Sequence, residues 1–234
     1  MKMEMECEII SREIPLKGIA YLVLRHTAPE RAAAVLLQAA EDAYAQGAVE
    51  VLAASMTPDV LFWEREVGKL RLEHVHDMLV LERSLSGIPC LSGRLQLKPL
   101  TQEQGEFWLN LHNETFFSVP NSATYDGEDL RQALSKDWQC GFVLESGAVV
   151  GIYEIDASGT VPEIAGIALR EEARGRGLGR ELLCTVMGRL RGQGHQKCCL
   201  IVSDANQTAY ALYQSMGFAC TQIKSRWFRL HLTG

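Results

Sequence analysis

The chain has 234 residues, of which 47% are hydrophobic and 22% charged, and its formal net charge at pH 7 is −6. This size allows one large core or two smaller ones, and the negative balance argues against nonspecific nucleic-acid binding, which needs a basic surface. No apolar run reaches the length of a membrane span, and Met1–Glu6 carries charges where a signal peptide needs an apolar core. We therefore expect a cytoplasmic protein without a membrane partner.

The first third of the chain predicts a β-α-β order. Gly18–Leu24 is an apolar strand, Thr27–Glu30 is a capping box with proline in the first helical turn, and Val49–Met56 is a second apolar strand. The helix between them ends at Gly47 and carries apolar residues at helical spacing, which are Ala33, Leu36, Leu37, Ala40 and Tyr44.

Neither a disulfide framework nor a metal site is indicated. The seven cysteines are an odd number without a Cys-x-x-Cys pair, so we expect mostly core thiols. His74 and His76 would share one face of a strand, but their alternation with Val75 also suits an exposed strand face, and no further ligand set accompanies them. No metal is predicted.

A domain boundary is predicted shortly before residue 95. Ser84–Gly93 has the Ser, Gly and Pro content of a linker, and Leu95–Leu100 then opens the next domain. We expect an N-terminal α/β domain over residues 1–92, without catalytic function, and a catalytic domain over residues 93–234.

An aromatic and turn-rich segment, Phe116–Gly127, lies between two helical stretches. Two interpretations of the acidic residues at its end stay open. Asp126, Glu128 and Asp129 either attract a cationic amine or start the helix that continues through Leu130.

The most informative stretch is an apolar strand, Glu163–Leu169, followed by a loop rich in glycine and arginine. Glycine backbone approaches an anion closely and takes positive φ angles, and guanidinium groups suit phosphate oxygens. The loop leads into an amphipathic helix over Glu181–Leu190, whose unpaired first-turn amides and dipole favour negative charge. Lys197–Ser203 is the next buried strand. Together these elements predict a site for a pyrophosphate.

Two familiar phosphate motifs do not fit this loop. A Walker loop ends in Gly-Lys-Ser/Thr, whereas this loop has Gly179-Arg180-Glu181. The dinucleotide fingerprint needs a glycine directly after the strand and an acidic residue about 20 residues later. In this chain Arg170 stands where that glycine is needed.

Two motifs in register carry a family resemblance. Arg174-Gly-Arg-Gly-Leu-Gly179 matches the acyl-CoA signature Arg/Gln-x-x-Gly-x-Gly/Ala. Asn206-Gln-Thr-Ala-Tyr-Ala-Leu-Tyr-Gln-Ser-Met-Gly-Phe218 matches Asn-x-x-Ala-x-x-Leu-Tyr-x-x-x-Gly-Phe. Residues from about 95 to 234 therefore resemble the Gcn5-related N-acetyltransferase (GNAT) superfamily. The resemblance implies an α/β fold with a mixed, splayed sheet flanked by helices.

The resemblance also implies the roles of individual residues. The strand before the loop would pair with the pantetheine arm of acetyl-CoA through Ile167, Ala168 and Leu169. The pyrophosphate would be held by Arg174, Gly175, Arg176, Gly177, Leu178, Gly179 and Arg180. Asn206 would support the pantetheine side, Tyr213 would protonate the leaving thiolate, and Glu163 would be the general base. In similar enzymes, residues corresponding to Phe116–Gly127 build the acceptor pocket.

Each role has a structural alternative. Tyr213 can pack on the core, Glu163 can be a solvated carboxylate at a strand end, and the arginines can decorate a solvated turn. Asn206 can be a plain helix N-cap, can contact the cofactor, or can do both.

The expected function is transfer of the acetyl group of acetyl-CoA to a primary amine of a small molecule or peptide, by direct attack in a ternary complex. The alternative is a sensor or regulatory module that binds acyl-CoA without turnover. The N-terminal β-α-β unit is either a degenerate second GNAT half, which would make the chain a tandem GNAT, or an unrelated α/β extension. A homodimer is possible, and the sequence does not identify the acceptor.

Overall fold

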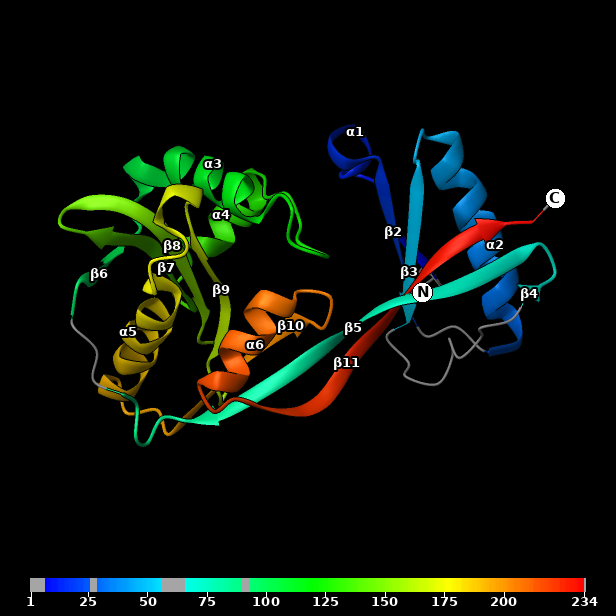
Figure 1. Cartoon of the computed structure of the whole chain (residues 1–234). Coiled ribbons are helices and arrows are strands. Elements are labelled where there is room, and N and C mark those ends of the chain that lie inside the picture. Colours follow the sequence, from blue (N-terminus) through cyan, green and yellow to red (C-terminus); the bar gives the residue numbers. More distant parts are fainter. Residues whose placement is uncertain (1–6, 26–28, 56–65, 90–92, 234) are drawn as a thin grey trace. The chain divides into compact units, whose positions relative to one another are not determined.

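The computed structural model describes residues 7–25, 29–55, 66–89 and 93–233. Thr27 and Ala28 of the predicted capping box, Met56 at the end of a predicted strand, and residues 90–92 of the predicted linker lie outside the described residues. The chain forms two compact units (Figure 1). Unit 1 comprises Met1–Leu79 and Ile223–Gly234, and unit 2 comprises Val80–Gln222. Among the described residues, no helix has the length and apolar composition needed to cross a bilayer.

Unit 1 contains the predicted β-α-β order. Its elements are β1 (Cys7–Ile10), α1 (Ile14–Lys17), β2 (Ile19–Leu24), α2 (Pro29–Ala45), β3 (Glu50–Ser55), β4 (Glu66–Val67), the first part of β5 (Leu70–Ser84) and the last part of β11 (Ala219–Leu232). The strand order is β1-β2-β3-β11-β5, with β4 beside β5. β2 and β3 are parallel and stay paired along their whole length, from Ile19↔Glu50 to Leu24↔Ser55.

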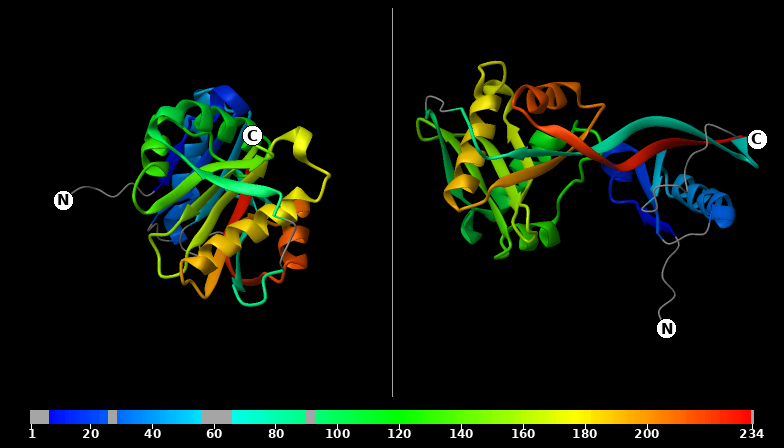
Figure 2. Two further views of the ribbon diagram at one scale, coloured as in Figure 1. Left: turned by 90° about the vertical axis from the view of Figure 1, so that its left-hand side faces the viewer. Right: turned by 90° about the horizontal axis from the view of Figure 1, so that it is seen from below.

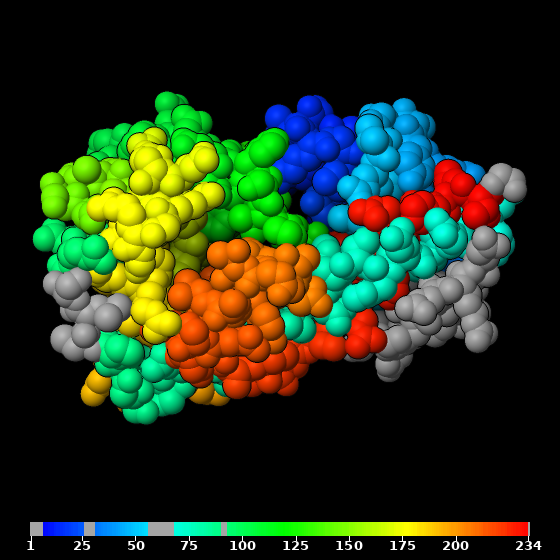
Figure 3. Space-filling view, viewed as in Figure 1, coloured from blue at the N-terminus to red at the C-terminus, as the bar shows by residue number. Residues whose placement is uncertain are grey.

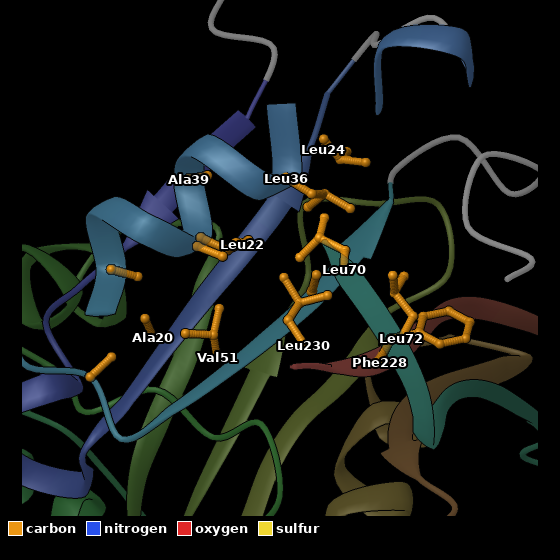
Figure 4. Packing of buried hydrophobic residues seen from close by; sticks show 14 of the residues in the cluster. Ala20, Leu22, Leu24, Leu36, Ala39, Val51, Leu70, Leu72, Phe228 and Leu230 are labelled. Carbon is orange, nitrogen blue, oxygen red and sulfur yellow. The ribbon is translucent and has the colours of Figure 1, made fainter. Parts of the chain in front are cut away.

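The core of unit 1 lies between α2 and the sheet (Figure 4). The buried stripe of α2 is Ala32, Leu36, Ala39, Ala40 and Ala43. Its small side chains let the helix approach the strands, where Leu22 and Val51 are fully buried. The prediction was right for Leu36 and Ala40, whereas Ala33, Leu37 and Tyr44 lie half-buried at the margin of the stripe.

Unit 2 contains the two sequence motifs. Its elements are the last part of β5, β6 (Leu95–Pro99), the 3-10 turn η1 (Gln102–Gln104), α3 (Gly105–Phe116), α4 (Gly127–Ala133), β7 (Trp138–Glu145), β8 (Ala148–Asp156), β9 (Glu163–Leu169), η2 (Glu171–Ala173), α5 (Leu178–Gly192), β10 (Lys197–Ser203), α6 (Gln207–Ser215) and the first part of β11. The strand order is β6-β7-β8-β9-β10-β5-β11, and β9 and β10 are parallel.

Helices cover both faces of the sheet in unit 2. Ile152 of β8 packs in the cluster formed with α3 and α4, which also contains Trp108. The next residue, Tyr153, points the other way, because neighbouring side chains on a strand alternate. Its ring lies 6.0 Å from the guanidinium carbon of Arg189 in α5. Therefore α3 and α4 lie on one face and α5 lies on the other.

The strands β5 and β11 contribute residues to both units, and they appear as two long neighbouring strands in Figure 2. The units therefore differ from the predicted ranges 1–92 and 93–234: residues 80–92 belong with unit 2 and residues 223–234 with unit 1. The composition shift at Ser84–Gly93 does not mark the division between the units, which falls within β5 and within β11. Where the chain separates into independently folding domains stays a prediction.

Truncation of Leu22 tests the core of unit 1. Leu22 is 0% exposed, so Leu22→Ala should destabilise the protein by about 2–5 kcal/mol through lost burial and a cavity. Urea unfolding followed by circular dichroism measures the effect. Val49→Ala is the control, because Val49 is 83% exposed and its truncation should cost less than about 0.5 kcal/mol. Equal midpoints for the two variants would contradict this core.

Candidate functional site

The strand β9 separates from β10 after a single register pair. It stays paired with β8 from Asp156↔Glu163 to Gly151↔Leu169, but its register with β10 is recorded only at Cys199↔Glu163. Cys199 N–H also donates to the carbonyl of Pro162 at 3.0 Å. The described backbone of β9 beyond Glu163 is thus left without a strand partner on that side. The predicted splayed sheet is confirmed.

A bulge in the β8–β9 ladder accompanies this separation. Ile155 pairs with Ile164 and Glu154 pairs with Gly166, so Ala165 is the extra residue. A bulge bends its strand and increases its twist. It also places the positions of Gly166 and Glu163 opposite Glu154 and Asp156, which lie on one face of β8. That face is covered by α3 and α4.

The glycine loop adopts the predicted backbone. Gly175 and Gly177 have φ angles of 73° and 77°, in the left-handed region that glycine adopts without strain. A Cβ at either position would have no atom within 4 Å, so the space beside this backbone is open. Gly177 is the N-cap of α5 and forms no side-chain cap, which leaves the first-turn amides of this helix available to an anion.

The three predicted arginines surround this loop, and each is held by another group of unit 2. The Nε of Arg174 donates to the carbonyl of Leu169 at 3.0 Å. Arg176 donates to Glu145 of β7 at 3.0 Å, and Arg180 donates to the hydroxyl of Ser215 in α6 at 2.9 Å. In the space-filling view, the surface is hollowed between the yellow η2–α5 segment and the orange α6 (Figure 3).

The second motif forms α6 as predicted. The side chain of Asn206 accepts a hydrogen bond from the Ala209 amide at 3.2 Å, so Asn206 is an N-cap. Tyr213 is half-buried and its ring lies 5.9 Å from that of Phe218. Burial raises the pKa of Tyr213 to about 12. The phenol therefore keeps its proton at neutral pH.

The acidic residues after the aromatic segment start a helix. Asp126 accepts from the amides of Glu128 and Asp129, and its own amide donates to the Asp129 carboxylate at 2.9 Å. This is a reciprocal capping box. The structure thus supports the helix-start interpretation and gives these carboxylates a local partner.

A buried polar cluster in unit 2 was not predicted from the sequence. Glu154 of β8 is 1% exposed, and its Oε1 lies 3.3 Å from Nε2 of His112 in α3. The hydroxyl of Tyr125 donates to its Oε2 at 3.3 Å, and the rings of His112 and Tyr125 stack with centroids 3.6 Å apart. A Cβ at Gly166 would come within 3.2 Å of Oε2. The sequence signal for this cluster is a glycine, Gly166, that pairs with a glutamate on the neighbouring strand. This signal can be recognised only once the register of β8 and β9 is known.

A second buried glutamate is compensated quite differently. Glu181 in α5 is 3% exposed and accepts the Arg94 amide at 2.6 Å, and the Arg94 guanidinium lies 2.8 Å from its other oxygen. Arginine stays charged at all ordinary pH, so Glu181 has a permanent counterion. The only described groups shown within hydrogen-bond distance of the Glu154 carboxylate are an imidazole and a phenol. Desolvation therefore raises the pKa of Glu154 to about 8.

The two histidines considered as metal ligands have structural contacts in unit 1. Nε2 of His74 lies 2.8 Å from Asp77, and the ring of His76 stacks on Trp227. No group of three or more His, Cys, Asp or Glu within the described residues is arranged to hold a metal ion.

Comparison with known proteins places these features in a family. Residues 105–218 match the model of the acetyltransferase (GNAT) family. The mycothiol acetyltransferase of Thermobispora bispora is 32% identical over 48% of this chain and 42% of that protein. The mycothiol acetyltransferase of Nocardiopsis dassonvillei is 28% identical over 73% of this chain and 62% of that protein. The chain thus spans less than two thirds of the length of either relative.

Solved structures share the fold. A GCN5-related N-acetyltransferase from Sphaerobacter thermophilus matches with a TM-score of 0.64 at 16% identity, covering 96% of this chain and 75% of that one. A tandem GNAT protein from the clavulanic acid biosynthesis pathway matches with a TM-score of 0.55 at 14% identity, covering 93% and 76%. Residues 105–218 of this chain, which contain both sequence motifs, the splayed strand β9 and the glycine loop, form a domain of the acetyltransferase (GNAT) family.

Proposed function

We propose that the protein is an N-acetyltransferase that moves the acetyl group of acetyl-CoA to a primary amine. The observation that carries this proposal is the separation of β9 from β10 beside a glycine loop that opens α5. This arrangement leaves backbone groups of β9 and the first amides of α5 available to one extended ligand. Relatives named as mycothiol acetyltransferases support acetyl transfer in general.

The available backbone fits the two ends of the cosubstrate. Ile167, Ala168 and Leu169 offer hydrogen-bonding groups that an extended pantetheine arm satisfies as an added strand. The open space beside Gly175 and Gly177 lets a pyrophosphate approach the first-turn amides of α5. Arg174, Arg176 and Arg180 supply positive charge around it, with Arg176 exchanging Glu145 for phosphate oxygens. Asn206 holds the start of α6 on the pantetheine side.

The chemistry needs one proton removed and one supplied, and acetyl-CoA contributes a thioester as the acetyl donor. An ammonium has no lone pair, so a base must take its proton before the nitrogen attacks. We assign this role to Glu163, at the point where β9 leaves β10. Tyr213 supplies a proton to the departing sulfur, because its phenol is protonated at neutral pH.

The described part of unit 1 does not show the strand separation that supports this role in unit 2. Its corresponding parallel strands, β2 and β3, stay paired through Leu24↔Ser55, and Arg25 after β2 donates to Glu8 at 2.8 Å. Fully paired strands leave no room for a pantetheine arm. We propose that unit 1 is a degenerate, noncatalytic GNAT half that kept the scaffold.

Placing an acidic side chain in the loop tests the cosubstrate site. Gly177→Glu should weaken acetyl-CoA binding at least about 100-fold, because like charges brought together cost several kcal/mol. Isothermal titration calorimetry measures the affinity. Two variants serve as controls. Gly177→Ala has the same positive-φ strain without the charge, and Gly188→Glu adds the same charge at an exposed position of α5. Retained affinity in Gly177→Glu would refute the site.

Removing one hydroxyl separates catalysis from binding. Tyr213→Phe should bind acetyl-CoA with unchanged affinity but lose about 100-fold or more in kcat, the range of general acid catalysis. Thiol release over a panel of amines and peptides gives the turnover and the acceptor class. Unchanged turnover would exclude Tyr213 as the acid. Binding without turnover on any acceptor in the wild type would favour the acyl-CoA sensor.

A further inference from the structure

Glu154 joins four parts of unit 2 that are far apart in sequence. It lies on β8, His112 comes from α3, Tyr125 comes from the segment between α3 and α4, and Gly166 faces it from β9. The tight approach of the carboxylate to Gly166 is possible only because position 166 has no side chain.

The segment after α3 is tied to this cluster through Tyr125. Asn113 of α3 makes two hydrogen bonds with the backbone of Tyr125, donating to its carbonyl at 3.0 Å and accepting its amide at 2.8 Å. The ring of Phe116 stacks on His112 with centroids 4.8 Å apart. A Cβ at Gly166 would also lie 3.1 Å from Phe116 Cζ. The beginning and end of the segment 116–126 therefore both contact the cluster that forms where Glu154 of β8 faces Gly166 of β9.

This place lies between the two proposed functional parts of β9. Gly166 is three residues after Glu163, the proposed base, and directly before Ile167, where the proposed pantetheine contacts begin. A segment anchored at Gly166 thus borders the point where the amine must meet the thioester.

The charges that face Glu154 leave its ionised form poorly compensated. His112 from α3 and Tyr125 from the connecting segment contact it, and Asp129 from α4 and Cys140 from β7 are close enough to interact with its charge. Gly166 contributes no side chain from β9. Oε1 lies 3.3 Å from Nε2 of His112 but is not aligned with it in a hydrogen bond, and no other described group bonds to Oε1. A neutral carboxylic acid therefore fits this place better than a carboxylate.

We infer that Glu154 is a positioning residue: as a neutral acid it ties α3 and the segment 116–126 to β9, and its ionisation loosens them. The role rests on the proposed acetyl transfer, in which this segment borders the approach of the acceptor amine. A positioning residue of this kind affects acceptor binding rather than the affinity for acetyl-CoA.

Thermal unfolding tests the protonation of Glu154. Because its pKa rises from 4.5 to about 8 on folding, the native state holds a proton that the unfolded state releases between these values. Its contribution to stability is full below pH 4.5 and is lost as pH rises to 8. From pH 5 to pH 8, the Tm of the wild type should therefore fall by about 5 °C or more relative to the Tm of Glu154→Gln, which does not titrate. A constant gap, as expected for the exposed Glu106→Gln on α3, would contradict this.

Hydrogen exchange of the full chain tests the positioning role without any acceptor. After correction for intrinsic exchange, protection of peptides covering 116–126 should fall by up to about tenfold per pH unit between pH 5.5 and 7.5 in the wild type. Glu154→Gln mimics the neutral acid and should remove this dependence, whereas Glu106→Gln should keep it. The same pH dependence in the wild type and in Glu154→Gln would overturn the inference. Tyr125→Phe, which removes one hydroxyl, is the second variant should Glu154→Gln fail to fold, and it too should flatten the dependence.

Kinetics separate this inference from the proposed function. With an amine found in the thiol-release screen, the acceptor KM of the wild type should change between pH 5.5 and 8, and that of Glu154→Gln should change less, at equal affinity for acetyl-CoA. If acetyl-CoA does not bind the wild type, the proposed function fails while the exchange result stands. If turnover is normal but both proteins show the same KM profile, the positioning role alone is wrong.

Discussion

The site depends on the loss of strand pairing between β9 and β10 after Glu163. Backbone amides and carbonyls that lie inside a sheet are normally paired, and leaving them open has a free-energy cost unless water or a ligand satisfies them. Here the cost falls on one side of one strand, because β8 holds the other side through Leu169. The result is a strand that is fixed in position by β8 while its backbone groups on the other side stay open. The bulge at Ala165 supplies the bend that a regular ladder would resist.

Two glutamates show how one fold uses buried carboxylates in opposite ways. Glu181 is paired with Arg94, and this ion pair holds the start of α5 against the entry to β6. Glu154 has no arginine or lysine among its described contacts, so its charge depends on pH in the range where cells operate. The first arrangement suits a helix that presents amides to phosphate. The second suits a contact that can be made and released.

Local patterns were enough to predict the parts of the site that are continuous in sequence. The glycine loop, the helix it opens and the N-cap at Asn206 each depend on residues a few positions apart, and the structure agrees with them. Glu154, His112 and Tyr125 could not be found this way, because only the folded sheet and α3 bring them together. The return of β11 to unit 1 was missed for the same reason: pairing such as Phe228↔Ala53 joins residues far apart in the chain. Burial in α2 was predicted to within one residue of the helical stripe, the precision that periodicity allows.

The arginines around the loop show how unit 2 tolerates its own concentrated positive charge. Arg176 is paired with Glu145 at 2.9 Å, and that carboxylate is only 15% exposed in its side chain. An anion that binds the loop must compete with this carboxylate, so the net gain from Arg176 is the difference between two ion pairs and not the whole of one. Arg174 and Arg180 donate to neutral oxygens, a carbonyl and a hydroxyl. Exchanging these hydrogen bonds for phosphate oxygens costs less free energy than breaking the ion pair of Arg176. The backbone amides of α5 have no competing side-chain cap within the described residues. They and the two outer arginines should therefore contribute most of the affinity, and Arg176 should contribute less.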